Sequence, residues 1–250
     1  NYVLNRMTEE NYISEEQALD AKEQKIEFAE PGFAFKKAAH FILYIENYLY
    51  QKYGSNFLKE HGLKVYTTLD LNLQEEAEKA VKQGVERNKM YRSYNASLVA
   101  INPNNGEILA MVGSVNFWDM ENDGNVNITT SMRQPGSSIK LVNYSYAMEH
   151  AGYTPSTILL DTPVSYSNPW ETYTPVNYDH KFKGRVTLKT ALAESRNVPA
   201  VKVLNTYGVD KMIEQGKKMG ITTWNEPEKY GLSITLGAVE VKMTDMSVVF

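Results

Sequence analysis

The chain has 250 residues, of which 42% are hydrophobic and 22% charged, and its net charge is −4. These values are typical of globular proteins with one large domain or two smaller ones. Without a basic surplus there is no reason to expect a nucleic acid partner. The absence of cysteine excludes disulfides, thiol catalysis and cysteine-bound zinc.

Histidine spacing and hydropathy argue against a metal site and against a membrane span. The histidines are His40, His61, His150 and His180. They show no His-x-x-x-His spacing, so we do not expect a metal site. We also expect no cofactor. No apolar run reaches the roughly 18 residues that a span needs. The nearest candidate, AAHFILYIENYLYQ, includes a histidine, a glutamate and an asparagine, which favours an amphipathic helix.

The first 30 residues are acidic, with eight Asp or Glu against three Lys or Arg. Ser14 and Gln17 have the spacing of a capping box, which predicts a short helix from Glu15 to about Lys25. Pro31-Gly32 breaks this pattern and indicates a boundary. Because the chain starts with asparagine and not methionine, we expect it to be part of a longer protein.

The next segment is predicted to form a helix, a strand and a second helix. The first helix is expected over about 35–53, with Gly54 as its stop. GLKVYTTLD, residues 62–70, alternates in the manner of a strand. Asp70 is placed to cap the second helix. The apolar stripe of that helix consists of Leu73, Ala77, Ala80, Val81 and Val85.

A β-hairpin follows, in which ASLVAIN and EILAMVG are strands and PNNG is the turn. Most positions of both strands are apolar, so we expect the hairpin to be covered on both faces. Residues 114–135 are polar and predict a surface loop. Residues 137–151 fit a helix, and the proline-rich residues 152–185 fit loop with at most short strands.

The remaining sequence is helical in pattern. Three short helices are predicted at about 187–194, 198–206 and 209–219, and Gly208 and Gly220 follow the second and the third. A further helix is predicted to start at Thr244. The chain ends while this pattern is still apolar, which leads us to expect a truncated C-terminus.

The stretch RQPGSSIK, residues 133–140, places a serine and a lysine three residues apart after a Pro-Gly break. In a helix that begins at Ser137, Ser137 and Lys140 share one face, whereas Ser138 points about 100° away. A lysine acts as a base when burial lowers its pKa from about 10.4 toward neutrality. The helix N-terminus also favours the negative charge that develops in acyl transfer. Ser137 and Lys140 are therefore a candidate nucleophile and base.

Spacing alone does not establish this chemistry, because a serine helix cap followed by a surface lysine has the same pattern. A second polar pair is needed, and Ser-x-Asn occurs at residues 93–95, 114–116 and 195–197. Ser195 and Asn197 lie between two predicted helices, where a tight turn can aim both side chains into a cleft. Helix capping by these two residues is the alternative.

Several segments, in order, resemble the transpeptidase domain of class A penicillin-binding proteins. They are ASLVAINPNNGEILAMVG, RQPGSSIK, YTPVNYD at 173–179, GRVTLKTALAESRNVPAVKVLNTYG at 184–208 and YGLSITLGAVEV at 230–241. KVYTTLDLNLQEEAEKAV resembles the segment that leads into this domain. VLNRMTEENYISEEQALDA resembles the end of the glycosyltransferase domain that precedes it. The resemblance covers nearly the whole chain, and ordered segments are far more specific than Ser-x-x-Lys alone.

The resemblance implies a fold and a domain arrangement. The fold would be α+β, like that of penicillin-binding protein transpeptidases and serine β-lactamases, with helices and an antiparallel sheet that is incomplete at the C-terminus. Residues 1–30 would be the tail of a glycosyltransferase domain. Residues 31–93 would form a linker with helix, strand and helix, and residues 94–250 a truncated transpeptidase domain.

The resemblance also implies a function and roles for four residues. The parent protein would be a bifunctional enzyme on the outer face of the bacterial membrane, anchored by an upstream helix, with lipid II as its glycosyltransferase substrate. Its transpeptidase would cross-link peptidoglycan stem peptides ending in D-Ala-D-Ala, and β-lactams would acylate the same serine. Ser137 would be the nucleophile and Lys140 would accept its proton. Ser195 would pass a proton toward the leaving D-alanine, and Asn197 would bind the amide carbonyl of the substrate.

Two departures from the family pattern are visible. Leu141 follows the lysine where the family has proline, and no Lys-Thr-Gly or Lys-Ser-Gly is present. We expect this third motif downstream of the chain, so that the chain alone is inactive. The alternatives are a β-lactamase or β-lactam sensor domain with the same Ser-x-x-Lys, or a non-catalytic cell-wall scaffold. The residues that follow the chain would distinguish them.

Overall fold

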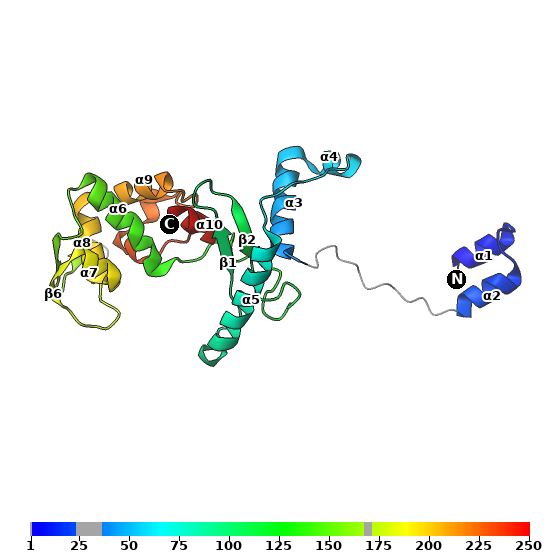
Figure 1. Cartoon of the computed structure of the whole chain (residues 1–250), viewed down its shortest axis with the longest axis horizontal. Coiled ribbons are helices and arrows are strands. Elements are labelled where there is room, and N and C mark those ends of the chain that lie inside the picture. The colour runs from blue at the N-terminus through cyan, green and yellow to red at the C-terminus, as the bar shows by residue number, and fades with distance from the viewer. Residues whose placement is uncertain (1, 24–36, 168–171) are drawn as a thin grey trace. The chain divides into compact units, whose positions relative to one another are not determined.

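The computed structural model describes residues 2–23, 37–167 and 172–250, and it divides into two units, Asn1–Lys37 and Ala38–Phe250. The first unit contains helices α1 (Tyr2–Glu9) and α2 (Glu15–Glu23) (Figure 1). Among the described residues, none of the helices is both long and apolar enough to cross a bilayer.

Helix α2 begins with the predicted capping box. Ser14 Oγ accepts a hydrogen bond from Gln17 N–H at 3.1 Å, and Gln17 Oε1 accepts one from Ser14 N–H at 2.9 Å. This reciprocal pair satisfies two backbone donors that the helix itself leaves unpaired. The predicted start of this helix is confirmed, whereas the predicted boundary at Pro31-Gly32 lies outside the described residues.

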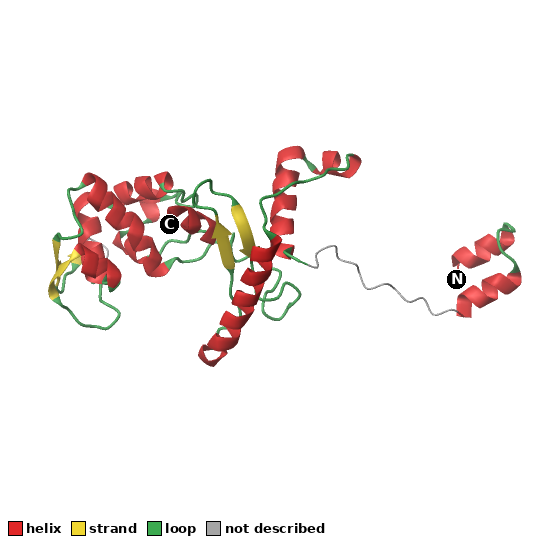
Figure 2. Ribbon diagram, viewed as in Figure 1, coloured by secondary structure: helices red, strands yellow, loops and turns green. Residues whose placement is uncertain are grey.

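Helices and short strands form the second unit (Figure 2). Its helices are α3 (Ala39–Tyr53), α4 (Ser55–Glu60), α5 (Leu71–Asn88), α6 (Lys140–His150), α7 (Leu188–Ala193), α8 (Asn197–Tyr207), α9 (Val209–Lys218) and α10 (Met243–Val249). Its 3-10 turns are η1 (Lys89–Tyr91), η2 (Gly136–Ile139), η3 (Pro227–Lys229) and η4 (Leu232–Leu236). Its strands are β1 (Leu98–Ile101), β2 (Ile108–Val112), β3 (Ile158–Asp161), β4 (Tyr166–Ser167), β5 (Thr172–Tyr173) and β6 (Gly184–Thr187).

The described strands pair as three two-stranded antiparallel sheets, β1 with β2, β3 with β6 and β4 with β5. The predicted α+β character is therefore confirmed. The helices predicted from residue 187 onward appear as α7, α8 and α9, and the helix predicted from Thr244 appears as α10, which starts one residue earlier.

The β1–β2 hairpin is covered on both faces, as predicted. Gly106 has φ +76 and its N–H bonds to the carbonyl of Asn102 at 2.9 Å, which closes the turn. Ala110 and Val112 pack against α5, whereas Met111 packs on the other side against Phe41 of α3. This alternation follows from the two-residue period of a strand.

The strand predicted over residues 62–70 is not formed, so that prediction is wrong. The segment has no regular secondary structure, and its links to β2 are few. Thr68 Oγ1 donates to the carbonyl of Ile108 and Asp70 N–H to that of Leu109. Leu63 and Val65 are 44% and 46% exposed. Alternation without a partner strand or a covered face does not make a β-ladder.

Asp70 caps α5 as predicted, because its Oδ1 accepts the N–H groups of Asn72 and Leu73. The stripe that α5 buries differs from the predicted one. Leu73 and Ala80 are exposed, and Gln74 takes a buried place. Gln74 exchanges two hydrogen bonds with the backbone of Met111 in β2, at 2.8 and 3.1 Å. A polar side chain is buried there because both ends of its amide are satisfied.

Two hydrophobic clusters lie on either side of the pair α6 and α8. The first cluster includes Val142 of α6 and Leu204 of α8 together with Trp224. The second includes Tyr144 of α6 and Val203 of α8 together with residues of β3, β6 and α7. The starts of α6 and α8 are thereby held in one packed body, which positions the side chains described below.

The segment after η4 packs directly on the turn before α6. Arg133 and Val241 exchange both backbone hydrogen bonds at 2.9 Å. Gly237 has φ +83, and a Cβ added there would lie 2.3 Å from both the N and the O atoms of Gly136. A larger residue at position 237 would have an unfavourable φ and would collide with the backbone of Gly136.

We predict that Gly237→Ala lowers the free energy of unfolding by roughly 1–3 kcal/mol, because backbone atoms cannot yield as a flexible side chain would. Urea unfolding of the chain measures this loss. Gly231→Ala is the matched control, since Gly231 has φ −109 and no atom within 4 Å of an added Cβ. Equal unfolding midpoints for the two variants would show that the close approach of Gly237 to Gly136 is unimportant.

Candidate active site

The predicted helix over 137–151 begins with a 3-10 turn, η2, before α6 starts at Lys140. The N–H of Lys140 bonds to the carbonyl of Ser137. In 3-10 geometry the side chains of residues i and i+3 eclipse, so Ser137 and Lys140 lie on one side of the turn. Ser137 is exposed and Lys140 is fully buried. Ser138 differs, because its Oγ donates to the carbonyl of Pro135 at 2.7 Å.

The ammonium of Lys140 meets the turn between α7 and α8. Its Nζ donates to Ser195 O at 2.7 Å, Ser195 Oγ at 3.1 Å and Asn197 Oδ1 at 2.7 Å. The structure therefore brings Lys140 together with the one Ser-x-Asn that the sequence analysis favoured. Within the described residues, Ser137 Oγ is not among the hydrogen-bond partners of this amine.

Burial lowers the pKa of Lys140 from 10.5 to about 8, and the positive charge of Arg196 adds to this effect. Removing an ammonium from water disfavours its charged form, and a neighbouring cation does the same. A base works best when its pKa lies near the working pH. Lys140 has the electrostatic character that a general base requires, and Ser137 is the exposed hydroxyl one turn before it.

Ser195 adopts a left-handed backbone conformation with φ +53. The turn that contains it is closed by hydrogen bonds from Ser195 N–H to Leu192 O and from Arg196 N–H to Ala191 O. A non-glycine residue in this region is uncommon, and such residues gather at functional sites. The conformation aims both the carbonyl and the hydroxyl of Ser195 at Lys140.

The side chain of Asn197 does not act as a helix cap, which was the alternative hypothesis for this residue. Its Oδ1 accepts from Lys140, and its Nδ2 donates to the carbonyl of Val176 at 2.9 Å. The residue at the N-cap of α8 is Arg196, which makes no side-chain cap. One N–H of the Asn197 amide remains beyond the bond to Val176, since an amide nitrogen carries two.

The other two Ser-x-Asn tripeptides have local structural roles. Asn95 Oδ1 accepts the N–H groups of Ala96 and Val115. Ser114 Oγ donates to the carbonyl of Gly124 at 2.6 Å, and the Asn116 side chain closes a turn with Trp118 N–H. The tripeptide alone therefore carries no functional signal.

Two further residues near Lys140, Arg196 and Asn143, were not predicted from the sequence on their own. Arg196 affects the pKa of Lys140 from within the Ser195–Asn197 turn. Asn143 lies one turn after Lys140 and donates to Ala200 O and Thr235 Oγ1 at 2.8 and 2.6 Å. Nothing in a single sequence marks such cross-links, because their partners are 57 and 92 residues away.

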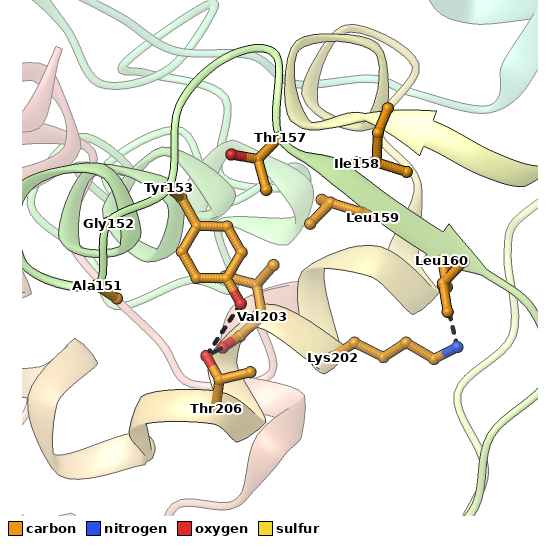
Figure 3. Close-up of a pocket in the computed structure, with 10 residues that line it drawn as sticks. All are labelled: Ala151, Gly152, Tyr153, Thr157, Ile158, Leu159, Leu160, Lys202, Val203 and Thr206. Atoms are coloured by element: carbon orange, nitrogen blue, oxygen red, sulfur yellow. Dashed lines mark hydrogen bonds between the residues drawn. The ribbon is translucent and has the colours of Figure 1, made fainter.

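A groove of about 520 Å³ lies elsewhere, along β3 and the side of α8 (Figure 3). Its lysine, Lys202, donates to the carbonyls of Leu160 and Thr162 at 3.0 and 2.9 Å, and Tyr153 OH pairs with Thr206 Oγ1. Neither Ser137 nor Lys140 lines it. Over the described residues, no group of three or more His, Asp or Glu is placed to hold a metal ion.

A family comparison covers the segment that contains Ser137, Lys140, Ser195 and Asn197. The family model described as "Penicillin binding protein transpeptidase domain" matches residues 96–234. The chain belongs to this family. Penicillin-binding protein 1A of Rickettsia conorii is 34% identical over 170 residues, which cover 67% of this chain and 20% of that protein. Penicillin-binding protein 1F of Bacillus subtilis is 31% identical over 247 residues, covering 95% of this chain and 32% of that protein.

Solved penicillin-binding proteins share the fold. Penicillin-binding protein 1A from Haemophilus influenzae superposes with a TM-score of 0.70 at 22% identity, over 98% of this chain and 50% of that one. PonA1 from Mycobacterium tuberculosis gives 0.69 at 21% identity, over 85% and 56%. The chain thus spans a fifth to a third of the curated relatives quoted above. The predicted resemblance to a segment of a class A penicillin-binding protein is confirmed.

The depressed pKa of Lys140 predicts a pH-dependent stability. Between its folded pKa of about 8 and its unfolded value of 10.5, the unfolded chain holds a proton that the folded chain lacks. The penalty for burying the ammonium is therefore fully present below pH 8 and disappears as the pH rises through 10.5. Relative to Lys140→Met, the wild type should gain about 3 kcal/mol of unfolding free energy across this window.

Urea unfolding of both proteins at a series of pH values measures the difference. Lys140→Met also loses the hydrogen bonds to Ser195 and Asn197. That loss does not depend on pH, so it shifts the unfolding free energy of the variant equally at every pH. Parallel pH profiles for the two proteins would contradict a lowered pKa of Lys140.

Proposed function

We propose that this penicillin-binding protein segment contributes the acylation site of a serine-type D,D-transpeptidase that cross-links peptidoglycan stem peptides. The observation that carries the proposal is the buried amine of Lys140, with a pKa of about 8, held by Ser195 and Asn197 next to the exposed Ser137. The family to which the chain belongs supports this choice of reaction.

In the proposed acylation, neutral Lys140 accepts the hydroxyl proton of Ser137 as Oγ bonds to the carbonyl carbon of the penultimate D-alanine. The C–N bond to the terminal D-alanine then breaks, and a proton that passes through Ser195 reaches the leaving amine. The free N–H of the Asn197 amide binds the carbonyl of the substrate amide. An acceptor amine next attacks the ester and releases Ser137. No cofactor takes part in this chemistry.

Lys140 fits the role of base because its three bonds to Ser195 and Asn197 use all the protons of an ammonium. Loss of one proton frees a lone pair while two bonds still hold the side chain. Ser195 fits the role of relay, since its Oγ lies 3.1 Å from Nζ and the residue is exposed. β-Lactams would acylate Ser137 as mimics of D-Ala-D-Ala.

For the whole protein we propose a membrane-anchored enzyme with this region on the outer face of the bacterial membrane. Residues 1–30 would be the end of a glycosyltransferase domain that uses lipid II, residues 31–93 a linker and residues 94–250 part of the transpeptidase domain. Class A relatives along the matched length support this arrangement.

We predict that Ser137→Ala abolishes labelling of the full-length protein by a fluorescent penicillin, a loss of at least about 1,000-fold in rate. Ser138→Ala is the matched control and should retain labelling, because its hydroxyl bonds to Pro135 O and faces away from Lys140. Gel fluorescence after a timed reaction measures both. Persistent labelling of Ser137→Ala would exclude Ser137, and an unlabelled wild type would favour a non-catalytic scaffold.

A further inference from the structure

The residue between Ser195 and Asn197 is tied into the protein interior. The Arg196 side chain is 6% exposed, and its Nε and Nη2 lie 2.9 and 2.8 Å from Asp161 Oδ2. Its Nη1 lies 2.8 Å from Asp179 Oδ2. Asp161, at the end of β3, is itself fully buried. A buried guanidinium and carboxylate stay in place only as a pair, so Asp161 fixes the middle of the turn.

A second contact runs from Asp161 to the same turn through Asn177. Asp161 Oδ1 accepts from Asn177 Nδ2 at 2.7 Å. Asn177 Oδ1 in turn accepts the N–H of Asn197 at 2.9 Å and that of Val198 at 3.2 Å. Asn177 therefore caps α8 from 20 residues away, in place of the cap that Arg196 does not make.

Asp161 and the carbonyl of Lys181 together fix which way the Asn177 amide points, because Asn177 Nδ2 donates to Asp161 Oδ1 and, at 2.9 Å, to Lys181 O. An ionised carboxylate only accepts hydrogen bonds, so it orients the NH₂ group toward itself and the carbonyl oxygen toward α8. Its other oxygen accepts from Arg196 Nε and from the N–H of Lys183 at 3.1 Å. Both oxygens of Asp161 must be acceptors for this arrangement to form.

We propose that Asp161 is a positioning residue, which holds Ser195 and Asn197 in register with Lys140 through Arg196 and Asn177. The inference rests on the proposed function, in which Ser195 and Asn197 serve the acylation of Ser137. Among the described residues, the hydrogen-bond partners of Asp161 are Asn177, Lys183 and Arg196, and Ser137 is not one of them. Asp161 fixes the conformation of the turn from which Ser195 and Asn197 reach Lys140.

The hydrogen-bonded network around Asp161 and Arg196 also influences the pKa of Lys140. Of the charged side chains in the described residues, Arg196 is the one that acts on Lys140, whose other neighbours, Ser195 and Asn197, are neutral. Asp161 and Asp179 offset the charge of Arg196. Removal of the buried counter-charge leaves Arg196 free to lower the pKa of Lys140 further, whereas a turn that opens to water would raise it.

The experiment compares Asp161→Asn, Asn177→Ala and the matched control Asp179→Asn in the full-length protein. The readout is the rate of Ser137 acylation by a fluorescent penicillin as a function of pH. The rate rises with the neutral fraction of Lys140, so the midpoint of the acid limb reports its pKa, and the plateau reports the geometry of the site. Circular dichroism checks that each variant is folded.

For Asp161→Asn we expect a plateau at least about tenfold lower, because misplacing a catalytic group by on the order of 1 Å costs up to about 100-fold. The introduced asparagine side chain has one acceptor oxygen, whereas this arrangement requires two. The midpoint should move to lower pH, because the buried counter-charge of Arg196 is lost. Asn177→Ala should lower the plateau without moving the midpoint, since it changes no charge. Asp179→Asn should keep the plateau. Asp179 is 42% exposed, its side-chain hydrogen bonds in the described residues go to Arg196 and to Lys181 N–H, and Arg196 keeps its buried partner Asp161 in this variant.

A wild-type plateau in Asn177→Ala overturns the proposal, and this variant decides the question if Asp161→Asn does not fold. A midpoint in Asp161→Asn that rises toward 10.5, the ordinary value for lysine, also overturns it, since the residue would then only keep the site closed. Failure of the proposed function can be distinguished from failure of the positioning role, because in the first case the wild type itself would not be labelled at Ser137.

Discussion

The buried amine of Lys140 is the constraint around which this part of the molecule is arranged. An ammonium that leaves water must find hydrogen-bond acceptors, and otherwise its burial costs several kcal/mol. Ser195 and Asn197 supply those acceptors from a turn 55 to 57 residues further along the chain. The start of α8 must therefore lie against the start of α6, and the packing of the two helices follows from that requirement.

Other contacts further from Lys140 also join segments that are distant in the sequence. Asn143 joins α6 to the carbonyl of Ala200 in α8 and to Thr235 in η4. Gly237, just after η4, packs on the backbone of Gly136 beside the candidate nucleophile. On the other side, Asp161 and Arg196 hold the turn that faces Lys140. The exposed Ser137 thus lies on a turn whose neighbours are fixed by buried polar contacts.

Features that depend on local sequence could be predicted well. The Ser14–Gln17 capping box, the Asp70 cap and the β1–β2 hairpin each rest on residues close in sequence. The strand over 62–70 was predicted wrongly because alternation says nothing about whether a partner strand exists. Ser195 and Asn197 could be selected only through the family resemblance, because helix capping was the simpler interpretation of that stretch alone. The roles of Asp161 and Asn177 depend on contacts 16 to 35 residues apart that no local pattern encodes.

The central claim is that Ser137 is the residue acylated beside Lys140. The most direct measurement is mass spectrometry of the full-length protein after brief treatment with a β-lactam, followed by proteolysis and fragmentation of the modified peptide. We predict a single adduct, located on Ser137. An adduct on Ser138, on Ser195 or outside residues 133–140 would contradict it.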